Sequence, residues 1–199
     1  ASAGIAAARA HLGAALPDAR IAGIDATEII AKGAEADVLI PTMARVDGAL
    51  MDAVSGLRLV IQFGSGIEGV DIEAASARGI AVANVPTAGT GNAESVAEWS
   101  VMAAIAVMRQ LPVALDEIRG GASWGKPIGR SLLGKTAGLV GMGGIGEALA
   151  ARLAPFGMRM IGVKRTPDPA LAARLGMDRI DTMDGLPRLL EEADIVFLC

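Results

Sequence analysis

TAGLVGMGGIGEALAARLAPF, residues 136–156, contains three successive sequence patterns. Residues 136–141 form a short, continuous apolar run, which predicts a β-strand covered on both faces. The run leads directly into a glycine-rich turn of the pattern GxGxxG, made up of Gly141-Met142-Gly143-Gly144-Ile145-Gly146. Residues 147–156 then place apolar side chains at helical spacing. The stretch therefore predicts a strand, a tight turn and a helix in immediate succession.

The glycines of this turn have separate roles in a dinucleotide-binding site. Gly141 permits the tight turn, Gly143 lets the backbone approach a pyrophosphate, and Gly146 lets the helix pack closely on the sheet. The unpaired N–H groups at the helix start favour the pyrophosphate charge. An ordinary strand–helix turn rich in glycine is the alternative, but the flanking strand and helix favour the functional interpretation. We predict that residues 141–146 bind NAD(P) in a Rossmann-type domain.

The end of the next predicted strand, residues 158–164, indicates which dinucleotide is preferred. An NAD site usually has Asp or Glu there to bind the ribose hydroxyls. This chain has Lys164-Arg165-Thr166 instead. Lys164 and Arg165 would attract a 2′-phosphate that a carboxylate would repel. We predict that these three residues bind the cofactor and that NADP(H) is preferred. If the two cations are only solvated charges at a strand end, NAD(H) serves as well.

The composition excludes several classes of protein. The chain has 199 residues, a net charge of -4, 3% aromatic residues and no Tyr, so it lacks the charge and stacking side chains of a nucleic-acid-binding protein. No segment has the ~18 uninterrupted apolar residues of a membrane span. The single cysteine, Cys199, cannot form an internal disulfide and suits a reducing compartment. We predict no nucleic-acid partner, no membrane association, no metal site and a cytoplasmic location.

Short apolar runs alternate with helical patterns along the whole chain. The predicted strands are residues 37–41, 58–62, 80–85, 136–141, 158–164 and 194–198. The predicted helices are residues 5–16, 46–54, 71–78, 92–109, 144–156 and 184–193. Most of the runs are continuous rather than alternating in polarity, which is typical of parallel strands covered on both faces. The sequence therefore predicts an α/β protein built on parallel sheets.

The expected domain boundary lies in PTAGTG, residues 86–91, which has no apolar period. We predict two parallel-sheet domains, residues 1–91 and residues 92–199. The helix that opens the second domain is apolar nearly all round, with Val96, Trp99 and Met102 among its side chains. We expect this helix to be buried on several sides, either between domains or between subunits.

Three further stretches carry a resemblance to a known family. They are FGSGIEGVD (residues 63–71) with GIAVANVP (79–86), NAESVAE (92–98) and LGKTAGLV (133–140). In order and spacing the chain resembles the D-isomer-specific 2-hydroxyacid dehydrogenases from about residue 37 onward. That family includes glyoxylate/hydroxypyruvate reductases, phosphoglycerate dehydrogenases and formate dehydrogenases. The combined match is far more specific than the glycine pattern alone.

The resemblance implies a flavodoxin-like substrate domain at residues 1–91 and a Rossmann dinucleotide-binding domain at residues 92–199. In the family, backbone N–H groups of the loop matching Gly64-Ser65-Gly66 hold the substrate carboxylate, and glycine lets such groups converge on an anion. A plain β-turn of small residues is the alternative. Asn92 matches a family position near the active-site cleft and is also a good helix N-cap. We predict Gly64, Ser65, Gly66 and Asn92 as substrate-binding residues.

Four charged residues have simpler explanations. We expect Asp71 and Asp184 to cap helices, since Asp is well suited to an N-cap. Glu98 and Arg109 match recurrent family positions on the long helix, but pairing on the helix surface explains them equally well.

The chemistry of the family uses an Arg, a Glu or Asp, and a His, which acts as the general acid/base. All three follow the strand that matches residues 194–198, so we expect no catalytic residue in this chain. We also expect that a first strand of the substrate domain is missing. The sequence thus has the pattern of a chain truncated at both ends, with an incomplete Rossmann domain.

The resemblance implies an enzyme that transfers hydride between NAD(P)H and a small 2-oxo or D-2-hydroxy acid, of the glyoxylate or hydroxypyruvate type. It also implies a homodimer with the long helix near the interface. Two alternatives stay open. One is a non-catalytic nucleotide-binding module or fragment of this fold, and the other is a dehydrogenase of the same fold that acts on formate or phosphite.

Overall fold

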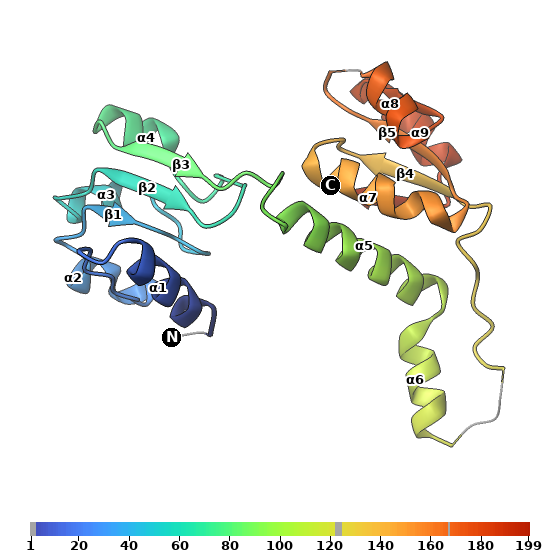
Figure 1. Ribbon diagram of the computed structural model, residues 1–199, viewed down its shortest axis with the longest axis horizontal. Coiled ribbons are helices and arrows are strands. Elements are labelled where there is room, and N and C mark those ends of the chain that lie inside the picture. Colours follow the sequence, from blue (N-terminus) through green and yellow to red (C-terminus); the bar gives the residue numbers. More distant parts are fainter. Residues whose placement is uncertain (1–2, 122–124, 167) are drawn as a thin grey trace. The chain divides into compact units, whose positions relative to one another are not determined.

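The computed structural model describes residues 3–121, 125–166 and 168–199, and the chain divides into two compact units (Figure 1). The first unit is Ala1–Pro86 and the second unit is Thr87–Cys199. The division falls a few residues before the boundary expected at residues 91 and 92.

The short segment after Pro86 goes with the second unit because hydrogen bonds tie it to the start of a helix. The Thr87 carbonyl accepts from the Ala93 N–H at 3.3 Å and from Thr90 Oγ1 at 3.1 Å. Ala93 lies in the long helix α5, Asn92–Met108, and Thr90 directly precedes it, so residues 87–91 form a turn that leads into that helix.

The first unit contains a three-stranded parallel sheet of order β1-β2-β3, with strands Val38–Leu39, Leu59–Gln62 and Ala81–Asn84. Its helices are α1 (Ala3–Ala15), η1 (Ala26–Glu28), α2 (Ile29–Lys32), α3 (Gly48–Ala53) and α4 (Ile72–Ala77). The core contains the buried Val46, Met51, Val54 and Val60, which lie on the strands and on the segments that connect them. The three strands predicted in this half are confirmed, each with narrower bounds.

Helix α4 begins where the sequence predicts. The Asp71 carboxylate accepts a hydrogen bond from the Ala74 N–H at 2.9 Å, so Asp71 is confirmed as an N-cap. Asp184 is not a cap, because it lies inside the short helix η3, Met183–Gly185, and makes no capping hydrogen bond. The tight 3-10 turn starts earlier than the helical pattern of the sequence suggests.

The second unit contains a four-stranded parallel sheet of order β6-β5-β4-β7. The strands are β4 (Thr136–Val140), β5 (Arg159–Val163), β6 (Arg179–Asp181) and β7 (Ile195–Leu198). Besides α5 and η3, its helices are α6 (Leu111–Arg119), α7 (Gly144–Leu153), η2 (Ala154–Phe156), α8 (Pro169–Leu175) and α9 (Leu186–Glu192). The predicted strands and helices of this half are present, and α6, α8 and β6 are additional.

Helices cover both faces of this second sheet. On one face, Leu139 of β4 packs with Leu149 of α7 and Leu171 of α8, and α5 lies against α7. On the other face, α9 approaches β4 so closely that a Cβ at Gly138 would lie 2.6 Å from a Leu189 methyl carbon. The continuous apolar runs of the sequence thus belong to strands buried on two sides, and the α/β fold class is confirmed.

Helix α5 is buried on one side only within this chain. Ala93, Ala97 and Ala104 are buried, whereas Trp99 is 68% exposed and Val107 is 75% exposed. The expectation that α5 is buried on several sides is therefore not met by the described residues of the chain.

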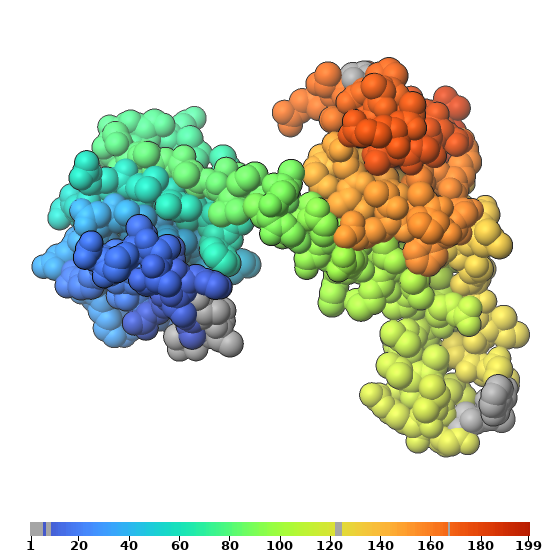
Figure 2. All heavy atoms as spheres, in the orientation of Figure 1, coloured from blue at the N-terminus to red at the C-terminus, as the bar shows by residue number. Residues whose placement is uncertain are grey.

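Helix α6 continues this apolar surface. None of its residues is buried, and in Figure 2 the yellow-green α6 extends away from the orange body of the second unit. The exposed apolar residues of the two helices are Val96, Trp99, Met102, Ile105, Val107, Leu111, Val113, Leu115 and Ile118. We call this set the α5–α6 apolar face.

Candidate cofactor and substrate sites

The glycine-rich turn begins at the end of β4 with a backbone conformation that favours glycine. Gly141 has φ +99°, and its N–H donates to the Val163 carbonyl of β5 at 3.0 Å. A Cβ at this position would lie 2.5 Å from the Cys199 carbonyl oxygen, which follows β7. Conformation and space both exclude a side chain at Gly141.

The other glycines of the turn divide into packed and open positions. A Cβ at Gly146 would collide with the Gly141 carbonyl oxygen, and one at Gly144 would lie 2.6 Å from Thr87 Oγ1. A Cβ at Gly143 would have nothing within 4 Å. The packed glycines let α7 start directly against β4, and Gly143 leaves an open approach to the backbone.

The start of α7 has no side-chain cap. Its N-cap is Gly143, and the Glu147 N–H donates to the Gly143 carbonyl at 2.9 Å. The N–H groups of Gly144, Ile145 and Gly146 have no carbonyl one turn earlier in the helix. The start of α7 can therefore bind an anion through its unpaired backbone N–H groups and through the positive end of the helix dipole.

Two residues of the motif contribute backbone atoms rather than side chains. Met142 is 1% exposed and packs in the core of the second unit, and Ile145 is partly buried on α7. The strand order adds a second indication, because β4 has β5 on one side and β7 on the other. That reversal of direction is a topological switch point, beside which open parallel sheets bind ligands at the carboxyl ends of their strands. The residues fit the pyrophosphate of a dinucleotide.

Lys164, Arg165 and Thr166 directly follow β5 at the same carboxyl edge of the sheet. The Lys164 N–H donates to the Asp181 carbonyl at 2.9 Å, which fixes its backbone beside the end of β6. The side chain of Lys164 is half-buried, and those of Arg165 and Thr166 are exposed. Among residues 3–121, 125–166 and 168–199, no carboxylate forms an ion pair with Lys164 or Arg165.

The nearby carboxylates have other partners. Asp181 accepts from Arg179 Nε at 2.7 Å, and Asp168 caps α8 by accepting from the Leu171 N–H at 2.9 Å. Both acids are therefore engaged elsewhere, and the end of β5 keeps two uncompensated positive charges, which suit a phosphate.

The loop Gly64-Ser65-Gly66 follows β2 in the first unit. Gly64 has φ +147°, and its carbonyl accepts from the Val85 N–H at 2.9 Å. The Ser65 carbonyl accepts from Asn84 Nδ2 at 2.6 Å. Within the described part of the chain, no carbonyl or carboxylate accepts from the N–H groups of Ser65 and Gly66. The loop thus has anchored carbonyls and free amides, as an anion-binding loop requires.

Asn92 is the first residue of α5 and is exposed, but it does not cap the helix. The N-cap is Gly91, at φ +79°, and no side chain makes a capping bond there. The N-cap interpretation of Asn92 is wrong, since the left-handed glycine before it already turns the chain into the helix. No partner among the described residues holds its amide.

Glu98 forms an ion pair, as the pairing interpretation expects, but its partner lies on a neighbouring helix. The Glu98 carboxylate accepts from Arg152 at 2.9 Å and so joins α5 to α7. Arg109 follows the end of α5 and forms no ion pair with the described residues. Surface pairing therefore accounts for Glu98 and not for Arg109.

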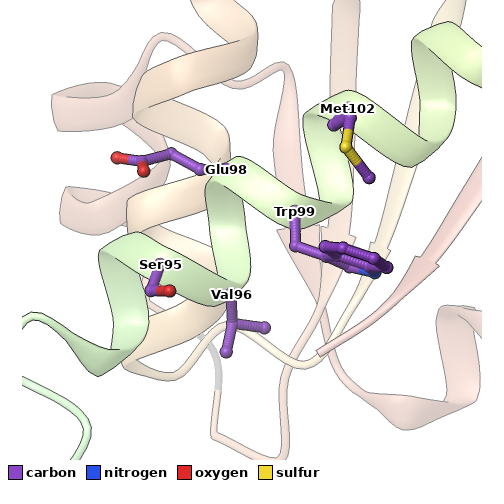
Figure 3. Close-up of a pocket in the computed structure, with 5 residues that line it drawn as sticks. All are labelled: Ser95, Val96, Glu98, Trp99 and Met102. Atoms are coloured by element: carbon purple, nitrogen blue, oxygen red, sulfur yellow. The ribbon is translucent and has the colours of Figure 1, made fainter.

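A hollow on the surface of α5 is separate from the glycine-rich turn. Its lining comes from one helix: Ser95, Val96, Glu98, Trp99 and Met102. Figure 3 shows Trp99 and Met102 together on one side of α5, while Glu98 points the other way. This surface belongs to the α5–α6 apolar face and carries none of the predicted cofactor residues.

Sequence reasoning missed two residues. Asn84 holds the Gly64-Ser65-Gly66 loop of the first unit, and Thr87 lies beside Gly144 of the glycine-rich turn in the second unit. The only signal was their position, at the end of a predicted strand and just after Pro86. In the described part of the chain, no three His, Cys, Asp or Glu side chains gather as metal ligands. Within the described ranges, each helix is either too short or too polar to span a lipid bilayer.

Residues 101–199 match the family model described as "D-isomer specific 2-hydroxyacid dehydrogenase, NAD binding domain". The chain is 36% identical over 177 residues to D-3-phosphoglycerate dehydrogenase of Mycobacterium tuberculosis H37Rv, covering 87% of this chain and 32% of the relative. It is 33% identical over 180 residues to glyoxylate reductase of Thermococcus litoralis, covering 85% and 52%. The chain therefore spans about a third to a half of the length of these relatives.

Among solved structures, the TT0316 protein of Thermus thermophilus is similar to this chain with a TM-score of 0.74 and 34% identity. The similarity covers 90% of this chain and 56% of that one. Both units of the chain therefore have counterparts in a longer protein of known structure.

Proposed function

This chain belongs to the D-isomer specific 2-hydroxyacid dehydrogenase family, and from that premise we propose that the protein containing it reduces a small 2-oxo acid with NAD(P)H. The proposed substrates are glyoxylate or hydroxypyruvate, with the D-2-hydroxy acid as product. When bound, the reduced nicotinamide supplies the hydride. The observation that carries the proposal is the uncapped, glycine-lined start of α7 at the switch point of the second sheet.

The residues of this chain have binding roles in the proposed reaction. The backbone of residues 141–146 holds the pyrophosphate. The amides of Ser65 and Gly66 hold the substrate carboxylate, and Asn92 offers a free amide side chain to the substrate. The first unit thus serves as substrate domain and the second as cofactor domain.

A preference for NADP(H) over NAD(H) is supported by the two cations after β5. Asp181 and Asp168 have their own partners, so Lys164 and Arg165 are free to bind a 2′-phosphate. Among the described residues, the positions that directly follow β5 are Lys164, Arg165 and Thr166, and none of them is the acid that usually binds the ribose hydroxyls of NAD.

The test supplies the full-length protein with glyoxylate or hydroxypyruvate and with NADPH or NADH. The absorbance of the reduced nicotinamide measures how fast each cofactor is oxidised. D-3-phosphoglycerate, formate and phosphite are tested in the oxidative direction. Turnover of a 2-oxo acid supports the proposal. Turnover of formate or phosphite alone would contradict the proposed substrate and would support the alternative dehydrogenase of the same fold. Cofactor binding without any turnover supports a non-catalytic nucleotide-binding module.

We also propose that the protein is a homodimer that covers the α5–α6 apolar face with a second copy. Exposed apolar side chains follow one another on two consecutive helices, whereas soluble proteins ordinarily expose such residues singly. A contiguous surface of this kind is typical of a protein–protein interface. Trp99→Glu should convert the protein to monomers in sedimentation equilibrium. Ile30→Glu is the matched control, since Ile30 is 60% exposed in the first unit. A wild-type monomer at every concentration contradicts the proposal.

A further inference from the structure

We propose that Asn84 is a positioning residue that shapes the loop Gly64-Ser65-Gly66 for a carboxylate, an inference that rests on the proposed function. Asn84 is the last residue of β3 and lies in register with Gln62, the last residue of β2. Because β2 and β3 are parallel, their ends meet at one edge of the sheet, and the loop leaving β2 starts beside Asn84.

Two hydrogen bonds hold successive carbonyl groups of the loop against the end of β3. The Val85 N–H donates to the Gly64 carbonyl at 2.9 Å, and Asn84 Nδ2 donates to the Ser65 carbonyl at 2.6 Å. One donor is backbone and the other is a side chain, so only the second depends on residue identity.

Fixing these carbonyls also fixes the amides of the loop. A trans peptide group is planar, and its C=O and N–H point in opposite directions. The Gly64 carbonyl therefore sets the Ser65 N–H, and the Ser65 carbonyl sets the Gly66 N–H. With both carbonyls turned toward β3, both N–H groups point away from it and toward the same side, where a carboxylate can bridge them.

The orientation of the loop peptides depends mainly on the hydrogen bonds from Val85 and Asn84, because few neighbouring atoms pack against the loop. A Cβ at Gly64 would have nothing within 4 Å, and the three atoms nearest to a Cβ at Gly66 all belong to the long, exposed side chain of Glu68. Packing therefore does not hold the Ser65–Gly66 peptide in its orientation. Without the Asn84 amide, this peptide can rotate, while the Gly64–Ser65 peptide keeps its bond to Val85.

The experiment uses the full-length protein labelled with ¹⁵N and titrated with glyoxylate. In the wild type, the amide signals of both Ser65 and Gly66 should shift and saturate. In Asn84→Ala, the dissociation constant should rise about tenfold, as expected for the loss of one hydrogen bond to a group that must be held. The Gly66 shift should be lost while the Ser65 shift persists, and the unfolding temperature should stay close to that of the wild type.

Two further variants separate positioning from a general structural role. Asn84→Asp keeps the shape but removes the donor and should weaken binding at least as much, whereas Asn84→Gln retains an amide and should restore part of the affinity. Gln110→Asn is the matched control, because it shortens an amide that donates to the Ile128 carbonyl at 3.3 Å in the second unit. Asn tolerates the φ of +50° at this position, and glyoxylate binding should not change.

A ligand-free measurement keeps the inference separate from the proposed function. The residual dipolar coupling of the Gly66 N–H should change in Asn84→Ala and that of Ser65 should not. An unchanged Gly66 coupling, or wild-type affinity in Asn84→Ala, overturns the role of Asn84 and leaves the proposed function standing. If the wild type shows no shift at either amide, the carboxylate-binding loop of the proposed function is wrong, and the inference is wrong with it.

Discussion

The glycine-rich turn of the second unit and the Gly64-Ser65-Gly66 loop of the first unit both present backbone amides, but they are held by different forces. At the turn, side-chain positions are filled by backbone atoms, such as the Cys199 carbonyl at Gly141. At the loop, a Cβ on Gly64 would meet open space, and hydrogen bonds from β3 hold the carbonyls. The turn is thus defined by excluded volume and the loop by two anchors, so different substitutions should break each.

The largest effect is expected at Gly141 of the turn. Gly141→Ala combines an unfavourable φ of +99° with a Cβ 2.5 Å from the Cys199 carbonyl oxygen. Overpacking of this kind costs about 1–3 kcal/mol, measured as the free energy of unfolding in urea. Gly64→Ala is the counterpart in the loop, where the strain is similar but no atom collides, so it should cost less. Equal losses at the two positions would contradict the distinction.

Gly143→Ala should separate binding from stability within the turn itself. Gly143 has φ −92° and open space around it, so the free energy of unfolding should stay within about 0.5 kcal/mol of the wild type. The added methyl group lies where the pyrophosphate approaches the backbone, and dinucleotide affinity should fall about tenfold, as overpacking of 1–3 kcal/mol implies. Calorimetric titration with NADPH measures the change. Unaltered affinity would mean that the cofactor does not approach Gly143.

The charge after β5 should set the choice between the two dinucleotides. Lys164→Asp removes a cation and introduces the carboxylate that NAD sites usually have at this point. The ratio of the NADPH to the NADH dissociation constant should rise about tenfold, as for the loss of one charge-assisted hydrogen bond. Arg58→Asp makes the same charge change on the first unit, and the ratio should stay constant there. A constant ratio in Lys164→Asp would remove the argument for NADP(H).

The smallest effect concerns acid stability, to which an ion-pair network around Glu192 in the second unit contributes. Arg159, Arg179 and Arg188 all donate to the Glu192 carboxylate and lower its pKa to about 2. A depressed pKa stabilises the folded state above the unfolded pKa of about 4.3, and this contribution is lost as the pH falls toward 2. The second unit should therefore lose stability over this interval.

Glu192→Gln should make the fall in urea midpoint between pH 5 and pH 3 shallower, since the side chain at position 192 no longer titrates. Glu73→Gln in the first unit is the control, because no Lys or Arg among the described residues forms an ion pair with Glu73. A pH dependence equal to that of the wild type in Glu192→Gln would contradict the role of Glu192.

How much the sequence could predict follows from how local each feature is. The glycine-rich turn is a six-residue pattern between a strand and a helix, so its place in the fold and the close packing at Gly141 and Gly146 could be inferred directly. Strand β6 was missed because Arg179–Asp181 is short and two of its three residues are charged. In the structure these charges pair with each other and with Glu192, so the strand does not depend on an apolar run.

The anchors of the loop could not be predicted because they depend on register between strands. Asn84 reaches Ser65 because β2 and β3 pair in a register that places their last residues, 62 and 84, side by side. Nothing in the local sequence distinguishes this amide from an ordinary polar residue at a strand end. Thr87 is similar, because it lies beside Gly144 although the two residues are far apart in the sequence.

Helix α6 has a consequence for hydrogen exchange. In an uncovered chain, a helix with no buried residue has few contacts that oppose local opening, so its amides should exchange with solvent deuterium at nearly the rate of an unfolded peptide. Strand β4 has four of its five residues buried and should exchange only when the second unit unfolds as a whole. Any slowing of exchange in α6 would come from whatever covers it. The exchange rate of this one helix is therefore a direct readout of occupancy of the α5–α6 apolar face.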